Sequence, residues 1–152
     1  MNKESKIVEY LINKKNRIKI HTNDIKKGDV FLSLQGSRDH GNKYINSSLM
    51  NKVKFIITDK KNNLPRNKSS ILIVNNIFEF LLMVANKKRN LFNGKVIGIT
   101  GSLGKTTVKE NLKFFLSKIC TVSASIKSYN NYLGVLISLI NIDLKSKFAI
   151  FE

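Results

Sequence analysis

Hydrophobic residues in the first ninety positions occur at two kinds of spacing, which predict alternating strands and helices. Short apolar runs bounded by polar turns predict strands at residues 18–20, 30–34, 55–57 and 71–74. Apolar residues at helical spacing predict helices at residues 3–15, 44–52 and 77–92. The polar stretch 59–70 holds the single proline, Pro65, and is expected to be a surface loop. Asn93-Gly94 closes the last helix and marks a predicted domain boundary.

The pattern after residue 94 alternates strictly between strand and helix. It predicts strands at 96–100, 121–125 and 148–151 and helices at 106–118 and 133–142. Such alternation is typical of a parallel sheet with right-handed crossovers, in which ligands bind at the carboxyl ends of the strands. Thr100, Ser125 and Glu152 lie at such ends and are expected to converge. The first of these helices is predicted to bury four apolar residues, Val108, Leu112, Phe115 and Ile119.

A glycine-rich segment, Gly98-Ile-Thr-Gly-Ser-Leu-Gly-Lys-Thr-Thr107, joins the first of these strands to its helix. Strand, glycine turn, Lys-Thr and helix is the layout of a phosphate-binding loop. Gly101 and Gly104 allow a tight turn whose N–H groups point inward at phosphate oxygens, and the helix adds its positive dipole end. Lys105 can reach the β- and γ-phosphates, and the Thr106 hydroxyl can ligate magnesium.

The glycine spacing departs from the commonest form of this loop. A strict G-x-x-x-x-G-K-T would have glycine where this chain has Ile99. A glycine-rich turn with an incidental lysine is therefore the alternative. If the segment binds nucleotide, the expected binding residues are Thr100, Gly101, Ser102, Gly104, Lys105, Thr106 and Thr107.

Four segments of the chain, in this order, resemble the Mur ligases, which form amide bonds with ATP during peptidoglycan synthesis. The first segment, residues 25–45, contains Ile25–Gly36, Asp39-His-Gly41 and Tyr44-Ile45. The second is the loop G-I-T-G-S-x-G-K-T-T-x-K-E. The third and fourth are Lys127–Val135 and Phe148–Glu152. The resemblance spans nearly the whole chain. Within the family the chain looks most like the ligase that adds D-alanyl-D-alanine to UDP-N-acetylmuramoyl-tripeptide.

The resemblance implies an α/β fold in two parts. Residues 1–93 would be a small α/β domain that binds the UDP-substrate, and residues 94–152 the beginning of a P-loop, mostly parallel-sheet ATP-binding domain. ATP and Mg²⁺ would be the cofactors, and UDP-N-acetylmuramoyl-peptide and D-alanyl-D-alanine the substrates. The resemblance also implies a cytoplasmic enzyme that is monomeric at full length. Family members are about three times as long, so the chain is interpreted as an N-terminal fragment, inactive alone, whose reading frame continues beyond Glu152.

The resemblance also assigns roles to single residues. Lys105 would be catalytic and neutralise the transferred phosphoryl group, Thr106 would bind magnesium, and Glu152 would hold a second magnesium. Asn130 and Asn131 would contact the UDP-sugar. The alternatives are a chance acidic residue at 152 and, for the two asparagines, Asx turns and a helix N-cap. Asp39 and His40 either touch the nucleotide or shape a turn.

Three positions depart from the family's pattern. The family usually has Asp-Ser/Thr-Arg where this chain has His21-Thr-Asn23, and Asp-Gly-His where this chain has Asp39-His-Gly-Asn42. A proline common after the Gly-Val step is Leu136 here. The first two departures concern the details of substrate contact rather than the fold.

The charge of the chain suggests a different class of function, nucleic-acid binding, because the net charge is +17. However, the excess is nearly all lysine and is spread along the chain, which favours a solvated surface. A basic surface would still attract UDP and ATP, and we expect neither nucleic acid nor a membrane as partner. The single cysteine, Cys120, is expected to be a buried thiol. Another Mur or folate-type ligase, or a non-catalytic P-loop module, remain as alternative functions.

Overall fold

The computed structural model describes residues 2–14, 17–125 and 131–152, which divide into two compact units. The first unit contains Arg17–Phe80 together with the chain up to Leu11, and the second contains Leu81–Glu152 together with a short segment from Ile12. The α-helices are α1 (Lys3–Asn13), α2 (Ser47–Lys52), α3 (Ile77–Leu91), α4 (Lys105–Ser117) and α5 (Tyr132–Ile140). Two 3₁₀ helices are η1 (Thr22–Asp24) and η2 (Gly41–Tyr44). The fold class is mixed α/β with parallel sheets, as predicted.

The first unit is built on a four-stranded parallel sheet in the order β1-β2-β3-β4. Its strands are β1 (Ile18–Lys19), β2 (Val30–Ser33), β3 (Phe55–Thr58) and β4 (Ile71–Ile73), so each predicted strand forms. Val30, Phe31, Ile56 and Ile57 are at most 2% exposed. Consecutive strand residues point to opposite faces, so both faces of this sheet are covered, as is usual for parallel sheets.

The helix predicted at residues 44–52 is shorter and is preceded by η2. Asn46 is extended, and its side chain accepts a hydrogen bond of 2.9 Å from the Leu49 N–H, so α2 begins only at Ser47. An asparagine that caps a helix cannot lie within it, because the cap residue has non-helical backbone angles. The boundary therefore follows from local capping, which the apolar pattern alone does not reveal.

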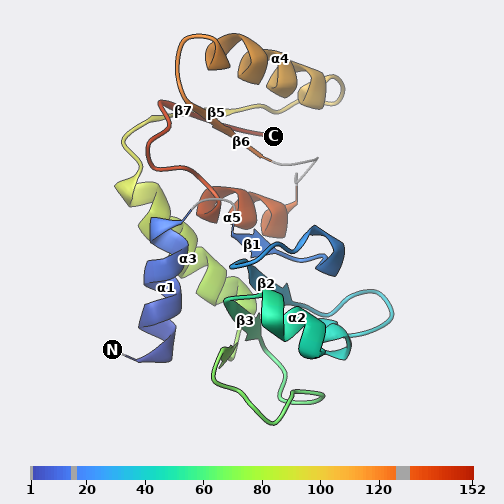
Figure 1. Cartoon of the computed structure of the whole chain (residues 1–152). Coiled ribbons are helices and arrows are strands. Elements are labelled where there is room, and N and C mark those ends of the chain that lie inside the picture. Colours follow the sequence, from blue (N-terminus) through green and yellow to red (C-terminus); the bar gives the residue numbers. More distant parts are fainter. Residues whose placement is uncertain (1, 15–16, 126–130) are drawn as a thin grey trace. The chain divides into compact units, whose positions relative to one another are not determined.

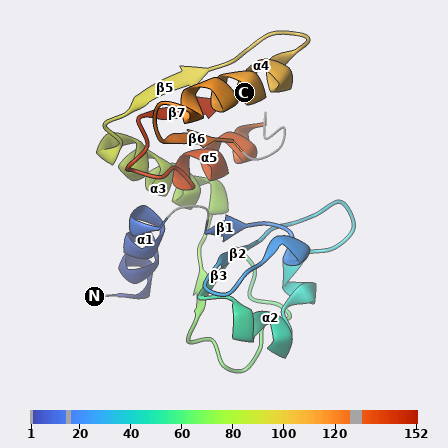
Figure 2. The same ribbon diagram turned by 45° about the horizontal axis from the view of Figure 1, so that its top comes forward.

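The second unit is built on a three-stranded parallel sheet in the order β5-β7-β6. Its strands are β5 (Lys95–Gly98), β6 (Val122–Ala124) and β7 (Phe148–Phe151). The last strand in the sequence lies in the middle, and its Ala149 and Ile150 are fully buried. Figures 1 and 2 show α4 and α5 on opposite sides of this sheet. The carboxyl end of β7, where Glu152 follows, consequently lies between the ends of β5 and β6.

The predicted buried face of α4 is wrong. Val108, Phe115 and Ile119 are 48%, 61% and 79% exposed. The helix instead directs the fully buried side chain of Lys109 inward, with Leu112 and Leu116 partly buried beside it. Apolar spacing alone cannot locate the buried face when a charged residue on that helix pairs with a buried partner.

Candidate functional site

The glycine-rich turn after β5 depends on glycine for its backbone conformation rather than for close packing. Gly101 and Gly104 have φ angles of 143° and 76°, in a region that side-chain-bearing residues rarely adopt. A Cβ atom at Gly104 would meet nothing within 4 Å, and one at Gly101 would come only within 3.9 Å of the Leu103 carbonyl oxygen. Leu103 itself is 91% exposed. The turn is therefore open at these positions, with space beside its two left-handed glycines.

The helix that follows this turn begins at Lys105 with glycine as its N-cap. Gly104 has no side chain to accept a hydrogen bond from the first-turn N–H groups of α4. These groups carry the positive end of the helix dipole. A turn that leaves them uncapped by a side chain is suited to hold an anion such as phosphate.

The Lys105 side chain folds back over the turn. Its Nζ donates hydrogen bonds of 2.6 Å to the Gly101 carbonyl oxygen and 3.3 Å to the Ser102 carbonyl oxygen. The ammonium group is thereby held against the backbone of the turn. Thr100, Ser102 and Thr107, the other predicted loop residues, are exposed.

Thr106, in the first turn of α4, and Glu152, directly after β7, lie side by side although 46 positions separate them along the chain. The Thr106 hydroxyl donates a 3.0 Å hydrogen bond to Oε1 of Glu152. The second carboxylate oxygen, Oε2, lies 3.3 Å from Nζ of Lys109. The Glu152 side chain is 1% exposed and that of Lys109 is fully buried.

The environment of Glu152 keeps its carboxylate ionised at neutral pH. Burial is the largest single influence and would raise the pKa of Glu152, because it disfavours the charged form. The hydrogen bond from Thr106, the contact with Lys109 and the charges of Lys109 and Lys105 together outweigh burial. The pKa of Glu152 therefore lies below its ordinary value. A buried anion beside a phosphate-type loop has the chemistry of a divalent-cation ligand.

The residues after β6 are only partly within the described chain. Ser125 follows β6, and its N–H donates 3.0 Å to the Ile150 carbonyl oxygen, which brings it close to the end of β7. Asn131 is the N-cap of α5, and its side-chain oxygen accepts a 2.8 Å hydrogen bond from the Gly134 N–H. The N-cap alternative is thus present for Asn131, and a substrate contact remains a prediction. Asn130 lies outside the described residues.

In the first unit, Asp39 and His40 take part in a turn. The His40 ring accepts a hydrogen bond from the Asn42 N–H and lies 3.0 Å from a carboxylate oxygen of Asp59. Asp39 pairs with Lys43 at 2.9 Å, and this pairing raises the pKa of Lys43. These contacts agree with the turn-shaping interpretation.

The apolar pattern does not identify several buried polar residues, among them Asn42, Lys88 and Lys109. Asn42 is 3% exposed, and its side-chain oxygen accepts hydrogen bonds from the hydroxyls of Ser33 and Thr58. Lys109 is fully buried on α4, and its Nζ lies 3.3 Å from Oε2 of Glu152. The available signal for Lys109 was its spacing, because a residue four positions after Lys105 lies on the same helix face.

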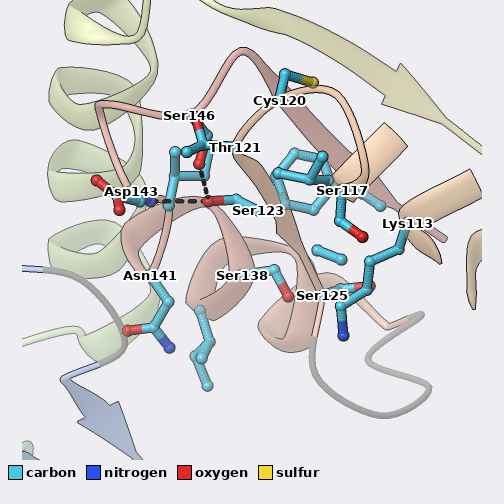
Figure 3. Close-up of a pocket in the computed structure, with 15 residues that line it drawn as sticks. Lys113, Ser117, Cys120, Thr121, Ser123, Ser125, Ser138, Asn141, Asp143 and Ser146 are labelled. Atoms are coloured by element: carbon cyan, nitrogen blue, oxygen red, sulfur yellow. Dashed lines mark hydrogen bonds between the residues drawn. The ribbon is translucent and has the colours of Figure 1, made fainter. Parts of the chain in front are cut away.

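A cavity of about 470 Å³ lies beside β6, between residues of α4 and α5 (Figure 3). Within it, the Ser123 hydroxyl contacts the Ser146 hydroxyl at 2.9 Å and accepts a hydrogen bond from the Asp143 N–H. The hydroxyls of Ser125 and Ser138 have no hydrogen-bond partner among the described residues. No residue of the glycine-rich turn lines this cavity, so it is separate from the Thr106–Glu152 site.

Comparison with known proteins gives a consistent set of similarities. The family model described as the Mur ligase middle domain matches residues 99–152. A UDP-N-acetylmuramoyl-tripeptide–D-alanyl-D-alanine ligase of Rickettsia prowazekii is 42% identical over 137 residues, which cover 90% of this chain and 30% of the relative. The ligase of the same name from Synechocystis is 30% identical over 138 residues, with the same coverage.

Solved structures show the same similarity in three dimensions. The MurF ligase from Thermotoga maritima in complex with ADP superposes with a TM-score of 0.70 at 29% identity, over 93% of this chain and 32% of that one. A MurF structure from Acinetobacter baumannii has a TM-score of 0.70 at 26% identity, over 91% and 30% of the two chains. The present chain thus spans about a third of the length of the proteins it matches.

Proposed function

This chain belongs to the Mur ligase family. We propose that it provides the phosphate loop and two metal ligands of an ATP-dependent ligase. The complete protein would join D-alanyl-D-alanine to UDP-N-acetylmuramoyl-tripeptide, the activity for which the R. prowazekii relative is named. The observation that carries this proposal is the contact between Thr106 and Glu152 beside an open loop. A structural glycine turn has no need of a buried carboxylate at that place.

Nucleotide binding is assigned to the glycine-rich turn and the start of α4. The backbone N–H groups from Thr100 to Thr107 would surround the phosphates, and the helix dipole would favour their charge. Lys105 would exchange its hydrogen bonds to the Gly101 and Ser102 carbonyl oxygens for contacts with the β- and γ-phosphates. The ADP complex of the T. maritima relative supports this assignment.

The residues at the end of β7 also fit a magnesium ion. Adjacent ligands of octahedral Mg²⁺, at 2.0–2.1 Å from the ion, lie roughly 3 Å apart. Oγ1 of Thr106 and Oε1 of Glu152 are separated by 3.0 Å, so the two could share one ion, in place of the two separate ions that the family resemblance implies. Among the described residues no group of three or more His, Cys, Asp or Glu side chains could hold a metal ion by itself. Bound there, magnesium would neutralise charge that develops on the transferring phosphoryl group.

The reaction then requires little covalent chemistry from this part of the protein. The carboxylate of the tripeptide attacks the γ-phosphorus to form an acyl phosphate and release ADP. The amine of D-alanyl-D-alanine attacks the acyl carbon, and phosphate leaves. Positioning and charge stabilisation supply most of the acceleration in such a reaction, and the ammonium of Lys105 is suited to both.

The substrate side of the proposal rests on fewer observations. Residues 1–93 would bind the UDP-substrate and 94–152 begin the ATP-binding domain. Asn130 and Asn131 would contact the UDP-sugar, and the oxygen of Asn131 is already used by the α5 cap. The amide nitrogen of Asn131, which the cap does not use, would be available to donate to the substrate. The complete enzyme would act in the cytoplasm as a monomer. No helix among the described residues has the length and hydropathy to cross a membrane.

Binding of ADP with Mg²⁺ to the 152-residue chain, measured by titration calorimetry, tests the nucleotide assignment. Lys105→Ala removes a hydrogen bond to a charged group, which is typically worth roughly 1.5–3 kcal/mol, so we expect about ten- to hundred-fold weaker binding. Lys87→Ala removes an exposed lysine of α3 in the same unit and is the matched control. Absence of ADP binding to the unsubstituted chain, or equal binding by both variants, would contradict the proposal.

In the complete enzyme the same substitution is expected to lower turnover rather than folding. Phosphate release that depends on D-alanyl-D-alanine should fall by about 10²–10³, the typical effect of losing one transition-state charge contact. Circular dichroism is the folding control. Phosphate release that is equally rapid when diaminopimelate replaces D-alanyl-D-alanine as the attacking amine would favour a different Mur ligase.

A further inference from the structure

The buried lysine of α4 lies directly behind the proposed metal ligand. Lys109 is one helical turn after Lys105, and its side chain has no exposed surface. Its Nζ lies 3.3 Å from Oε2 of Glu152 and 3.6 Å from a carboxylate oxygen of Glu110. Glu110 is 53% exposed, so solvent weakens that second contact, whereas Glu152 is 1% exposed.

The two oxygens of the Glu152 carboxylate are thus held by different partners. Oε1 accepts the hydrogen bond from Thr106, and Oε2 faces Lys109. This division fixes the rotation of the carboxylate and directs one oxygen toward the hydroxyl that would also bind the ion. Without the ammonium, Oε2 would have no hydrogen-bond or ion-pair partner among the described residues, in a place that water does not reach.

We propose that Lys109 is a positioning residue that holds Glu152 with one oxygen presented beside Thr106, so that the site couples Mg²⁺ binding to nucleotide binding. The inference rests on the proposed function, because it concerns the same metal site. It adds Lys109 to the residues that the site requires, besides the glycine-rich loop and the two metal ligands. Lys109 itself would contact neither nucleotide nor ion.

Two other roles for Lys109 predict different results. A lysine that only stabilises the fold would alter unfolding without altering the coupling between ion and nucleotide. A lysine that mainly repels the ion would weaken the coupling, so that its removal would strengthen Mg²⁺ binding. The positioning role requires that the removal of Lys109 weaken the coupling.

The experiment measures the dissociation constant of ADP in EDTA and at saturating Mg²⁺, for the 152-residue chain and its variants. The ratio of the two constants is the coupling. For Lys109→Met, which keeps the length of the side chain, we expect the coupling to fall at least ten-fold while the EDTA value stays within about two-fold. Lys109→Arg should restore much of the coupling. Lys113→Met, one turn further on at a side chain 50% exposed, should behave as the unsubstituted chain.

Each outcome is decisive. Failure of the unsubstituted chain to bind ADP would refute the proposed function, whereas an unchanged or increased coupling in Lys109→Met would refute only the present inference. If Lys109→Met fails to fold by circular dichroism, the substitution is made in a Glu152→Gln background, where no buried anion is left unpaired. There it should cause no loss of coupling beyond that of Glu152→Gln alone, and a further loss would refute the inference.

Discussion

The surroundings of the buried lysines in this chain could not be predicted from the sequence. Lys88, on α3, is 1% exposed, and its Nζ donates hydrogen bonds of 2.6 Å and 3.0 Å to the carbonyl oxygens of Ile12 and Lys14. Ile12 lies in the last turn of α1 and Lys14 directly follows the helix, where carbonyl groups lack intrahelical partners. Burial lowers the pKa of Lys88 from 10.5 to about 8, and Asp143 only partly opposes this effect.

This shift predicts a pH dependence of stability. Between pH 8 and pH 10.5 the unfolded chain holds a proton on Lys88 that the folded chain has lost, so the free energy of unfolding should rise with pH in this window. The gain from this one group is on the order of 2–3 kcal/mol. Denaturant unfolding at pH 7.5, 9 and 10 measures it.

The contribution of Lys88 is isolated by comparing Lys88→Met with Lys87→Met. Lys87 is the exposed neighbour on the same helix, and its variant should keep the slope of the unsubstituted chain. Lys88→Met should show a flatter dependence. An identical slope in all three proteins would contradict the assignment.

At the scale of elements, the limits of α4 are predicted correctly, but the face of the helix that is buried is not. Its limits, 105–117, lie within one residue of the predicted 106–118. Its apolar residues nevertheless lie largely outside the core, and Phe114 and Phe115 pack edge to face with ring centroids 5.4 Å apart. The inward face instead carries Lys109, whose ammonium group pairs with the buried carboxylate of Glu152, together with the partly buried Leu112 and Leu116.

The orientation of α4 predicts that Phe115→Ala will have a small effect. A fully buried phenylalanine typically costs 3–5 kcal/mol when truncated, whereas this one, 61% exposed, should cost less than about 1 kcal/mol. Ile150→Ala, in the fully buried centre of β7, should cost roughly 2–5 kcal/mol. Urea unfolding of the two variants compares them. A loss of unfolding free energy for Phe115→Ala as large as that for Ile150→Ala would indicate that the helix face predicted from apolar spacing is the buried one.

At the scale of the whole molecule, the net charge of +17 matters more for ligands than for the fold. Lysines occur throughout both units, and many lie on the surface. A diffuse positive potential attracts any polyanion, and salt screens it over about 10 Å at 0.1 M. The specificity of an anion site must therefore come from short contacts such as those of the glycine-rich turn.

This distinction predicts a limited salt dependence of ADP binding. Raising the ionic strength from 50 to 500 mM should weaken binding several-fold through screening of the general potential, while leaving saturable binding at one site. Lys87→Gln removes one remote charge and should barely alter the salt dependence. Binding that vanishes at 500 mM would indicate non-specific attraction and contradict a built phosphate site. Thermal unfolding at both ionic strengths shows whether the fold itself responds.

The sequence by itself determined the local elements of this protein and the motif that connects it to a family. Strands, helices and the glycine turn follow from side-chain period, turn residues and backbone freedom, which act over a few neighbouring positions. Only the tertiary structure decided that β7 lies between β5 and β6, that Glu152 therefore meets Thr106, and that Lys109 is buried behind it. These outcomes depend on contacts between residues distant along the chain. Burial and charge pairing in three dimensions determine them, and no local pattern records either one.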